Sequence, residues 1–364
     1  MSLASVLAAV AALFLAASSN PASGLEGSGA RQAGQSRQTQ IPPPSAAPGL
    51  GANTLSDSDK SEAAATFALK SDLGDKVWPG FAAAAIPILL YDTRFEFLLG
   101  SAGASAPWVK VGEDVLEGRP YFRRPAADPQ AFAVKVDSVW AGSVATLDTM
   151  NAKGPFKLSP DIHLVIILHE MFHAFEADQA PKRFAAALQS YKAEAGYPYD
   201  DKDFAAAWAA EGAALAGALK ASDDLEATVQ ARKFIEIRDA RRSKALLDVP
   251  QLDYERQLEW LEGLAEYAEI TFYKLAAGRP GPVPGTTFGT KLPWLLQYDF
   301  ARLQNQLGTQ KGDLRFYVSG MAQAFLLDRL DPDWKDQAAL SSLLLEDLIR
   351  QAVLTPEDRR PGDR

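Results

Sequence analysis

The pattern of apolar and polar residues divides the chain into four segments. The first, Leu3 to Ala17, is almost wholly apolar. Residues 20–60 are rich in Gly, Ser, Gln, Ala and Pro, a composition that buries too little apolar surface to offset the entropy of ordering. Regular apolar patterns then fill residues 61–354. We therefore predict a signal peptide over 1–19, a disordered linker, a single α+β domain, and a flexible tail over 355–364.

Strand-like runs dominate the first part of that domain, residues 61–150. Ile86–Tyr91 and Phe95–Leu99 are rich in β-forming residues, and Asp92-Thr93 between them suits a turn. Ala131–Val136 is a third candidate strand. These runs predict a small antiparallel sheet.

The second part of the domain, residues 151–354, has helical periodicity. Ser159-Pro160-Asp161 is typical of a helix start, with a capping hydroxyl, a proline in the first turn and an acid near the positive helix end. We expect this helix to reach Phe175 or beyond. Because strands come first and helices follow, the pattern predicts an α+β fold with a mainly helical second part. Further helices are expected over 204–221, 225–246, 254–276, 315–330 and 340–353.

Composition excludes several classes of function. The 364 residues include 37 basic and 46 acidic ones, a net charge of −9, and no basic patch that would indicate nucleic-acid binding. The chain has no cysteine, which excludes disulfides, zinc sites built on thiolates and a cysteine nucleophile. Any metal site must therefore use His, Asp and Glu.

The apolar N-terminal run indicates export. It ends in the small residues Ala16-Ala17-Ser18-Ser19, as in the cleavage zone of a signal peptide, although no Lys or Arg precedes it. The run is short for a membrane-spanning helix, which needs about 20 residues. We predict a secreted or periplasmic protein, with an uncleaved N-terminal anchor as the alternative and no other membrane contact.

All three histidines of the chain fall on the helix that starts at Ser159. His169 and His173 are four residues apart and share one helix face, so both imidazoles can reach one zinc ion at about 2.0–2.1 Å. Glu170 lies where it can take a proton from a metal-bound water. Apolar flanks predict that this helix is buried and that its polar groups need partners. His163 lies on another face, and we interpret it as structural.

A zinc site of this kind needs a third protein ligand. A third histidine six residues after His173 would fall at Gln179, and the glycine of that arrangement would fall at Glu176. The helix expected over 254–276 offers an alternative, because an acidic stripe runs beside its apolar stripe. The simplest interpretation of such a stripe is a solvated face. Periodicity places two of its members nearest the apolar border and does not choose between them. The acidic stripe consists of Glu255, Glu259, Glu262, Glu266 and Glu269, and the border pair is Glu262 and Glu269.

The run Glu259–Tyr267 resembles the second motif of the gluzincin group of zinc metallopeptidases. In that group a Glu on a later helix completes the zinc site, and Gly, an apolar residue and Ala often follow it. The resemblance implies that Glu262 is the third ligand, beside His169 and His173, in a zincin-like domain. Gly263 would let two helix backbones approach closely. Glu262 stands 89 positions after His173 (262 − 173), a longer separation than in the best-known members, which implies that helices are inserted between them.

The same resemblance implies a donor for the developing oxyanion, commonly a Tyr or a His. No histidine is left, and Tyr317 is favoured because small residues near it permit close packing; an ordinary core tyrosine is the alternative. The resemblance also implies that a sheet edge pairs with an extended peptide. The other tyrosines after Glu262 are Tyr267, Tyr273 and Tyr298.

Glu211 lies in an alanine-rich run that is apolar on every side. No Lys or Arg stands three or four residues from it, and a buried carboxylate needs a specific partner. That partner is the zinc, the free ring nitrogen of a ligating histidine, or an arginine of the stretch Arg238–Arg242. We favour the last two partners, and we predict Glu211 as a residue that orients a metal-binding histidine from behind.

Two functions follow from these features. The first is a zinc-dependent hydrolase, a peptidase acting on a peptide or protein substrate, in which Glu170 assists attack by zinc-bound water. The second is a helical binding or scaffold protein whose metal site is structural or vestigial. Glu170 favours the first function, because a structural site has no need of a carboxylate between its two ligands.

Overall fold

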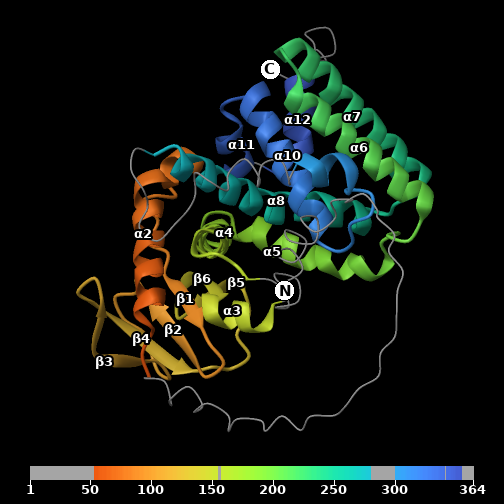
Figure 1. Cartoon of the computed structure of the whole chain (residues 1–364). Coiled ribbons are helices and arrows are strands. Elements are labelled where there is room, and N and C mark those ends of the chain that lie inside the picture. Colours follow the sequence, from red (N-terminus) through yellow and green to blue (C-terminus); the bar gives the residue numbers. More distant parts are fainter. Residues whose placement is uncertain (1–52, 155–156, 280–299, 341, 355–364) are drawn as a thin grey trace, which may run out of the picture.

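The α+β fold predicted from the order of strands and helices is confirmed (Figure 1). The computed structural model describes residues 53–154, 157–279, 300–340 and 342–354. The predicted signal peptide, most of the linker, the tail and Tyr298 lie outside the described residues. In the described part of the chain, no helix is both long and apolar enough to cross a bilayer. The elements are α2 (Asp57–Val77), β1 (Ile88–Tyr91), β2 (Phe95–Leu99), β3 (Val109–Leu116), β4 (Arg119–Pro125), β5 (Phe132–Val136), β6 (Val139–Ala145), α3 (Leu147–Lys153), α4 (Pro160–Gln179), α5 (Pro181–Ser190), the 3₁₀ helix η2 (Tyr191–Gly196), α6 (Lys202–Lys220), α7 (Asp224–Lys244), α8 (Val249–Ala277), α10 (Leu314–Leu330), α11 (Trp334–Leu340) and α12 (Leu345–Val353).

The sheet is mixed rather than antiparallel, which corrects the prediction. Its six described strands follow the order β3-β4-β2-β1-β6-β5. Most neighbours are antiparallel, including the predicted hairpin of β1 and β2. Strand β6 pairs parallel with β1, with Ile88 opposite Gly142. The pattern of each strand shows its buried face and not its direction, so this pairing of distant segments was not predictable from periodicity.

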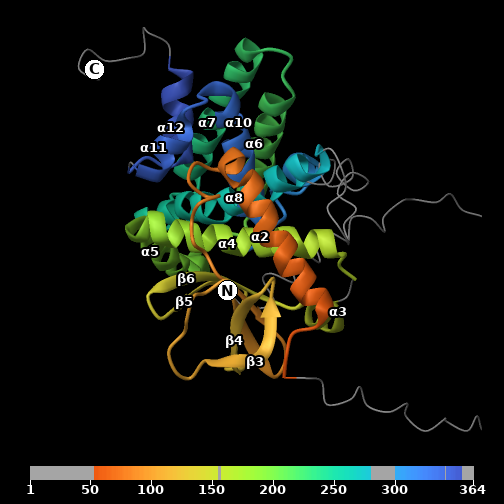
Figure 2. The same ribbon diagram turned by 90° about the vertical axis from the view of Figure 1, so that its left-hand side faces the viewer.

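Helix α2 was not predicted. It begins at Asp57, where the Ser56 hydroxyl accepts a hydrogen bond from the amide of Asp59. Its buried positions include Glu62 and Lys70, so an apolar stripe alone does not mark it. Figure 2 shows α2 lying across the side of both α4 and α8.

Helix α4 is the centre of the fold and is buried on all sides, as predicted. Every residue from Asp161 to Ala177 is buried. Pro160 stands at the helix start as expected, although the Ser159 side chain makes no capping bond. One face of α4 packs on β6, where a methyl group at Gly142 would lie 2.5 Å from the backbone nitrogen of Met171. Strand and helix backbones therefore meet directly beside Glu170.

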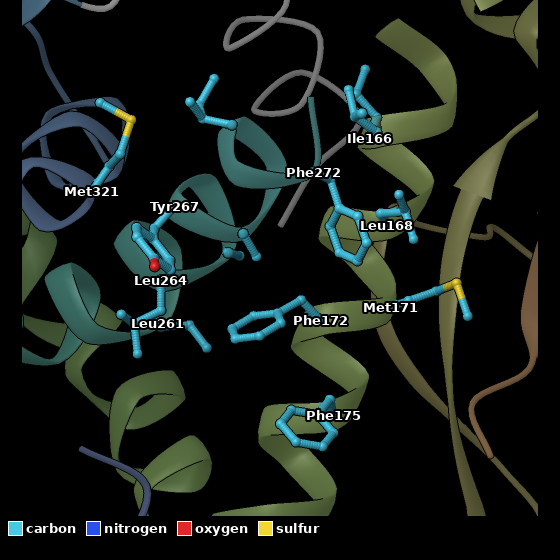
Figure 3. Close-up of a cluster of buried hydrophobic side chains, with 14 of the residues drawn as sticks. Ile166, Leu168, Met171, Phe172, Phe175, Leu261, Leu264, Tyr267, Phe272 and Met321 are labelled. Carbon is cyan, nitrogen blue, oxygen red and sulfur yellow. The ribbon is translucent and has the colours of Figure 1, made fainter. Parts of the chain in front are cut away.

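The opposite face of α4 packs on α8 through aromatic side chains. Figure 3 shows Phe172 and Phe272 filling the space between the two helices, whereas Met171 points toward the sheet. The Tyr273 hydroxyl on α8 donates to Asp161 on α4 at 2.8 Å. The two helices are thus held together both by apolar burial and by a buried hydrogen bond.

Helices α8 and α10 cross at two glycines, as predicted for Gly263. A methyl group at Gly263 would lie 2.4 Å from the Cα of Gly320, and one at Gly320 would lie 2.2 Å from the carbonyl oxygen of Glu259. Only residues without a Cβ permit this approach. The crossing brings α10, and Tyr317 three residues before Gly320, over the site on α4.

His163 is structural, as the sequence indicated, and joins three elements. Its Nδ1 lies 2.8 Å from the Glu62 carboxylate of α2, and its Nε2 lies 2.8 Å from the carbonyl oxygen of Ala145 at the end of β6. Both partners accept hydrogen bonds, so the ring donates from both nitrogens when it is protonated. Burial opposes that charge, but Glu62 and the Ala145 carbonyl outweigh it and raise the pKa of His163 above 6.5.

We predict that this contact makes stability depend on pH. Because the folded pKa of His163 is raised, its stabilising contribution is complete below about pH 6.5 and is lost as the pH rises through the folded pKa. His163→Gln should lower the free energy of unfolding by about 3–5 kcal/mol at low pH, because Glu62 is then buried without its partner. Urea unfolding of both proteins across the pH range should show this difference shrinking as the pH rises. A difference that grows with pH would contradict the assignment.

Candidate metal centre

The structure brings together the two histidines of α4 and one glutamate of α8. His169, His173 and Glu262 are buried, and their ligand atoms lie within 4.8 Å of one another. The helical spacing of four residues places both imidazoles on one face of α4, with ring centroids 4.8 Å apart. These are the three ligands predicted from the sequence.

Three buried atoms of this group make no well-formed hydrogen bond: His169 Nδ1, His173 Nε2 and Glu262 Oε2. The last two face each other at 3.4 Å as an ion pair and have no other partner. Two ligands of a tetrahedral zinc, each at about 2.0–2.2 Å, are about 3.3–3.6 Å from each other. Two ligand atoms at this spacing that have no other partner fit a metal ion, since buried polar atoms are usually fully hydrogen-bonded.

A carboxylate stands behind each histidine. His173 Nδ1 lies 2.9 Å from Glu176, three residues later on α4, and His169 Nδ1 lies 3.2 Å from Glu269 of α8. Metal-binding histidines usually give their second ring nitrogen to a carboxylate, which fixes the tautomer and the ring orientation. In His173 this leaves Nε2 for the metal.

Charge coupling in the site is strong. Burial raises the pKa of Glu262, but His173 and His169 outweigh burial and lower it to about 2. For His173 the burial effect is opposed by Glu262 and Glu176, which raise its pKa to about 10. The proton on His173 therefore balances Glu262, and a metal that takes Nε2 must release it. Burial raises the pKa of Glu170 to about 7, which suits a base working near neutral pH.

A second group of potential ligands shares His169 and adds Glu266 and Glu269. Arg302 approaches Glu266 at 3.5 Å and already supplies positive charge there. Glu269 faces the Nδ1 edge of His169, the position of an orienting carboxylate. The first group is therefore the better metal site, because His173 Nε2 and Glu262 Oε2 have no partner except each other, whereas Glu266 already has Arg302 beside it.

Aromatic side chains enclose the two imidazoles. Tyr317 stacks on His169, with centroids 5.6 Å apart and an interplanar angle of 12°, and Phe132 of β5 lies 4.8 Å from His173. Tyr317 also hydrogen bonds Glu262. Tyr317, the predicted donor, thus lies beside two of the three candidate ligands. The other described candidates, Tyr267 and Tyr273, donate to Asp328 and Asp161.

Glu211 is not behind a metal ligand. Both of its oxygens accept hydrogen bonds from arginines of α7, Arg238 and Arg241, which is the arginine alternative of the sequence analysis. The same arginines bind Glu255 and Glu259 of α8. The acidic stripe of α8 is therefore not a solvated face, since all five members are buried. Its first half pairs with arginines and its second half surrounds the histidines.

Sequence reasoning missed three contributors to the site. Glu176 could have been predicted as a partner of His173, because it stands one helical turn later on the same face. Glu269 was identified only as a border residue. Tyr191, whose hydroxyl donates to Glu262 at 2.8 Å, carried no local signal, since 71 residues separate the pair.

Comparisons with family models, with curated proteins and with solved structures found no match to this chain.

Replacement of single acids should rank their roles in metal binding. Glu262→Gln should lose zinc most completely, because it removes the ligand charge. Glu269→Gln should lose about 10–100-fold in affinity, as expected for a group that orients a ligand, and Glu266→Gln should stay near wild type. Competition of each purified variant against a zinc chelator measures this order.

Glu211→Gln serves as the control in this series. It should retain zinc affinity but unfold more readily, by about 3–5 kcal/mol, because two buried arginines lose a partner. Loss of zinc from Glu211→Gln with retention in Glu262→Gln would contradict the assigned ligand set.

Proposed function

We propose that this protein is a zinc-dependent hydrolase of the gluzincin type that cleaves peptide bonds. The observation that carries the proposal is the buried group in which His173 Nε2 and Glu262 Oε2 face each other at 3.4 Å and have no other partner. It contains the His-Glu-x-x-His run and the later Glu of the gluzincin pattern. A bound zinc would supply Lewis acidity toward a carbonyl and lower the pKa of a water.

The residues around the ligands have distinct tasks in this proposal. Glu170 is buried, and one of its oxygens has no hydrogen-bond partner. With its pKa raised by burial to about 7, it takes a proton from the attacking water and passes it to the leaving amine. The Tyr317 hydroxyl, held beside His169, donates a hydrogen bond to the oxyanion as it develops.

Strand β5 is the proposed binding edge for a peptide. It ends the described sheet on the side of β6, and its Phe132 contacts His173. An extended substrate that adds to this edge gains main-chain hydrogen bonds next to the ligands. The substrate is therefore proposed to be a peptide or an unfolded segment of a protein, with no nucleic acid involved.

The depth of the ligands favours a second candidate, a structural metal in a helical scaffold. His173 is 1% exposed and Glu262 is 0% exposed, so a substrate has little access to these ligand atoms. The buried Glu170 argues against this role, because a buried carboxylate with an unpaired oxygen destabilises the fold and does nothing for a structural site. In a catalytic site the Glu170 carboxylate acts as the general base.

Export through the N-terminal apolar segment is proposed to place the enzyme outside the cytoplasm, in the periplasm or the medium. N-terminal sequencing of the exported protein tests this. A mature protein that still begins at Met1 would instead support a membrane anchor.

Glu170→Gln should abolish hydrolysis while leaving the fold and the zinc content unchanged. The amide matches the carboxylate in shape but cannot accept the proton, and loss of a general base costs about 10²–10⁴-fold. Mass spectrometry of an unfolded protein incubated with each zinc-loaded enzyme measures cleavage. Asp178→Asn is the matched control, since Asp178 is an exposed acid on the same helix, and it should cleave normally. Equal cleavage by Glu170→Gln and wild type would contradict the proposed role.

A further inference from the structure

The two carboxylate oxygens of Glu262 have different surroundings. Oε1 accepts a hydrogen bond from the Tyr191 hydroxyl at 2.8 Å. Oε2 faces His173 Nε2 at 3.4 Å and has no other hydrogen-bond partner. Tyr317 also hydrogen bonds the Glu262 carboxylate. One oxygen is therefore held by the protein and the other is directed at the metal position.

A carboxylate ligand can bind a cation through one oxygen or both, and rotation about its last bond exchanges them. A fixed donor on one oxygen stops this exchange and sets the direction of the other. Groups behind a ligand commonly act in this way and alter metal affinity without touching the metal.

We propose that Tyr191 is a positioning residue that holds Glu262 so that Oε2 alone points to the metal. This inference rests on the proposed zinc site. It places behind the ligand Glu262 a residue of η2 that lies 71 positions earlier in the chain.

The position of Tyr191 is itself fixed by packing. Its ring packs edge-on against Tyr254 of α8, with centroids 6.2 Å apart and an interplanar angle of 67°. Segment η2 follows α5 directly and lies along α8. A hydroxyl on a ring held in this way loses little entropy when it donates, so its hydrogen bond orients the carboxylate firmly.

The chain contains a close internal match to this contact. Tyr197, at the end of η2, donates to Glu255 of α8 at 2.5 Å. Glu255 stands seven residues before Glu262, two turns away on the same helix, but it binds Arg241 and Arg242 rather than histidines. Two tyrosines of one short segment thus hold two buried glutamates of one helix, and only one of those glutamates faces the metal position.

Paired phenylalanine variants test the inference. Tyr191→Phe keeps the ring and removes only the hydroxyl. It should bind zinc about 10–100-fold more weakly in chelator competition. With cobalt in place of zinc, its visible spectrum should change, because Glu262 is free to bind through either oxygen. Tyr197→Phe should lower the thermal midpoint but keep wild-type zinc affinity and the wild-type cobalt spectrum.

The outcomes separate this inference from the zinc site itself. Wild-type zinc affinity and an unchanged cobalt spectrum in Tyr191→Phe would overturn the positioning role and leave the zinc site intact. Equal losses of zinc affinity in both variants would also overturn it, because they would indicate a general loss of packing. A wild-type protein that binds neither zinc nor cobalt would overturn the zinc site, and the positioning role with it.

Discussion

The structure depends on compensating five carboxylates that α8 carries into the interior. Charges that leave water without a partner cost several kcal/mol each, so the stripe needs partners from the segments around it. Helix α7 supplies arginines to Glu255 and Glu259. Near the other end, Arg302 approaches Glu266, and the histidines of α4 face Glu262 and Glu269. Position along a single helix thus separates an ion-pair cluster from the candidate metal site.

Backbone contacts determine where the histidines stand relative to that stripe. Gly142 lets β6 lie directly against α4, and the pair Gly263 and Gly320 lets α10 lie directly against α8. Helix α4 is therefore fixed from the sheet side while Tyr317 and Glu262 are brought to its other face. His163 adds a polar contact from α4 to α2 and to the end of β6. The candidate metal site is thus bounded by backbones that lie in direct contact.

The sequence predicted those parts of the site that depend on local spacing. The buried helix, the pair His169 and His173, and the close approach at Gly263 follow from patterns within a few residues. Glu262 was chosen over Glu269 by resemblance to a motif, because periodicity gives the face of a helix and not the element that packs there. For the same reason the acidic stripe suggested a solvated face, while the partners of Glu211 and Glu262 come from distant segments. The direction of β6 beside β1 and the role of Tyr191 likewise depend on contacts between remote parts of the chain.

The central claim is that one metal ion is held between His169, His173 and Glu262. Crystals grown with zinc and measured on both sides of the zinc absorption edge test it most directly. The account predicts one anomalous peak, about 2.0–2.2 Å from a nitrogen of each histidine and from one oxygen of Glu262. The other oxygen of Glu262 should still accept a hydrogen bond from Tyr191. A peak between His169, Glu266 and Glu269, or no peak in the protein interior, would contradict it.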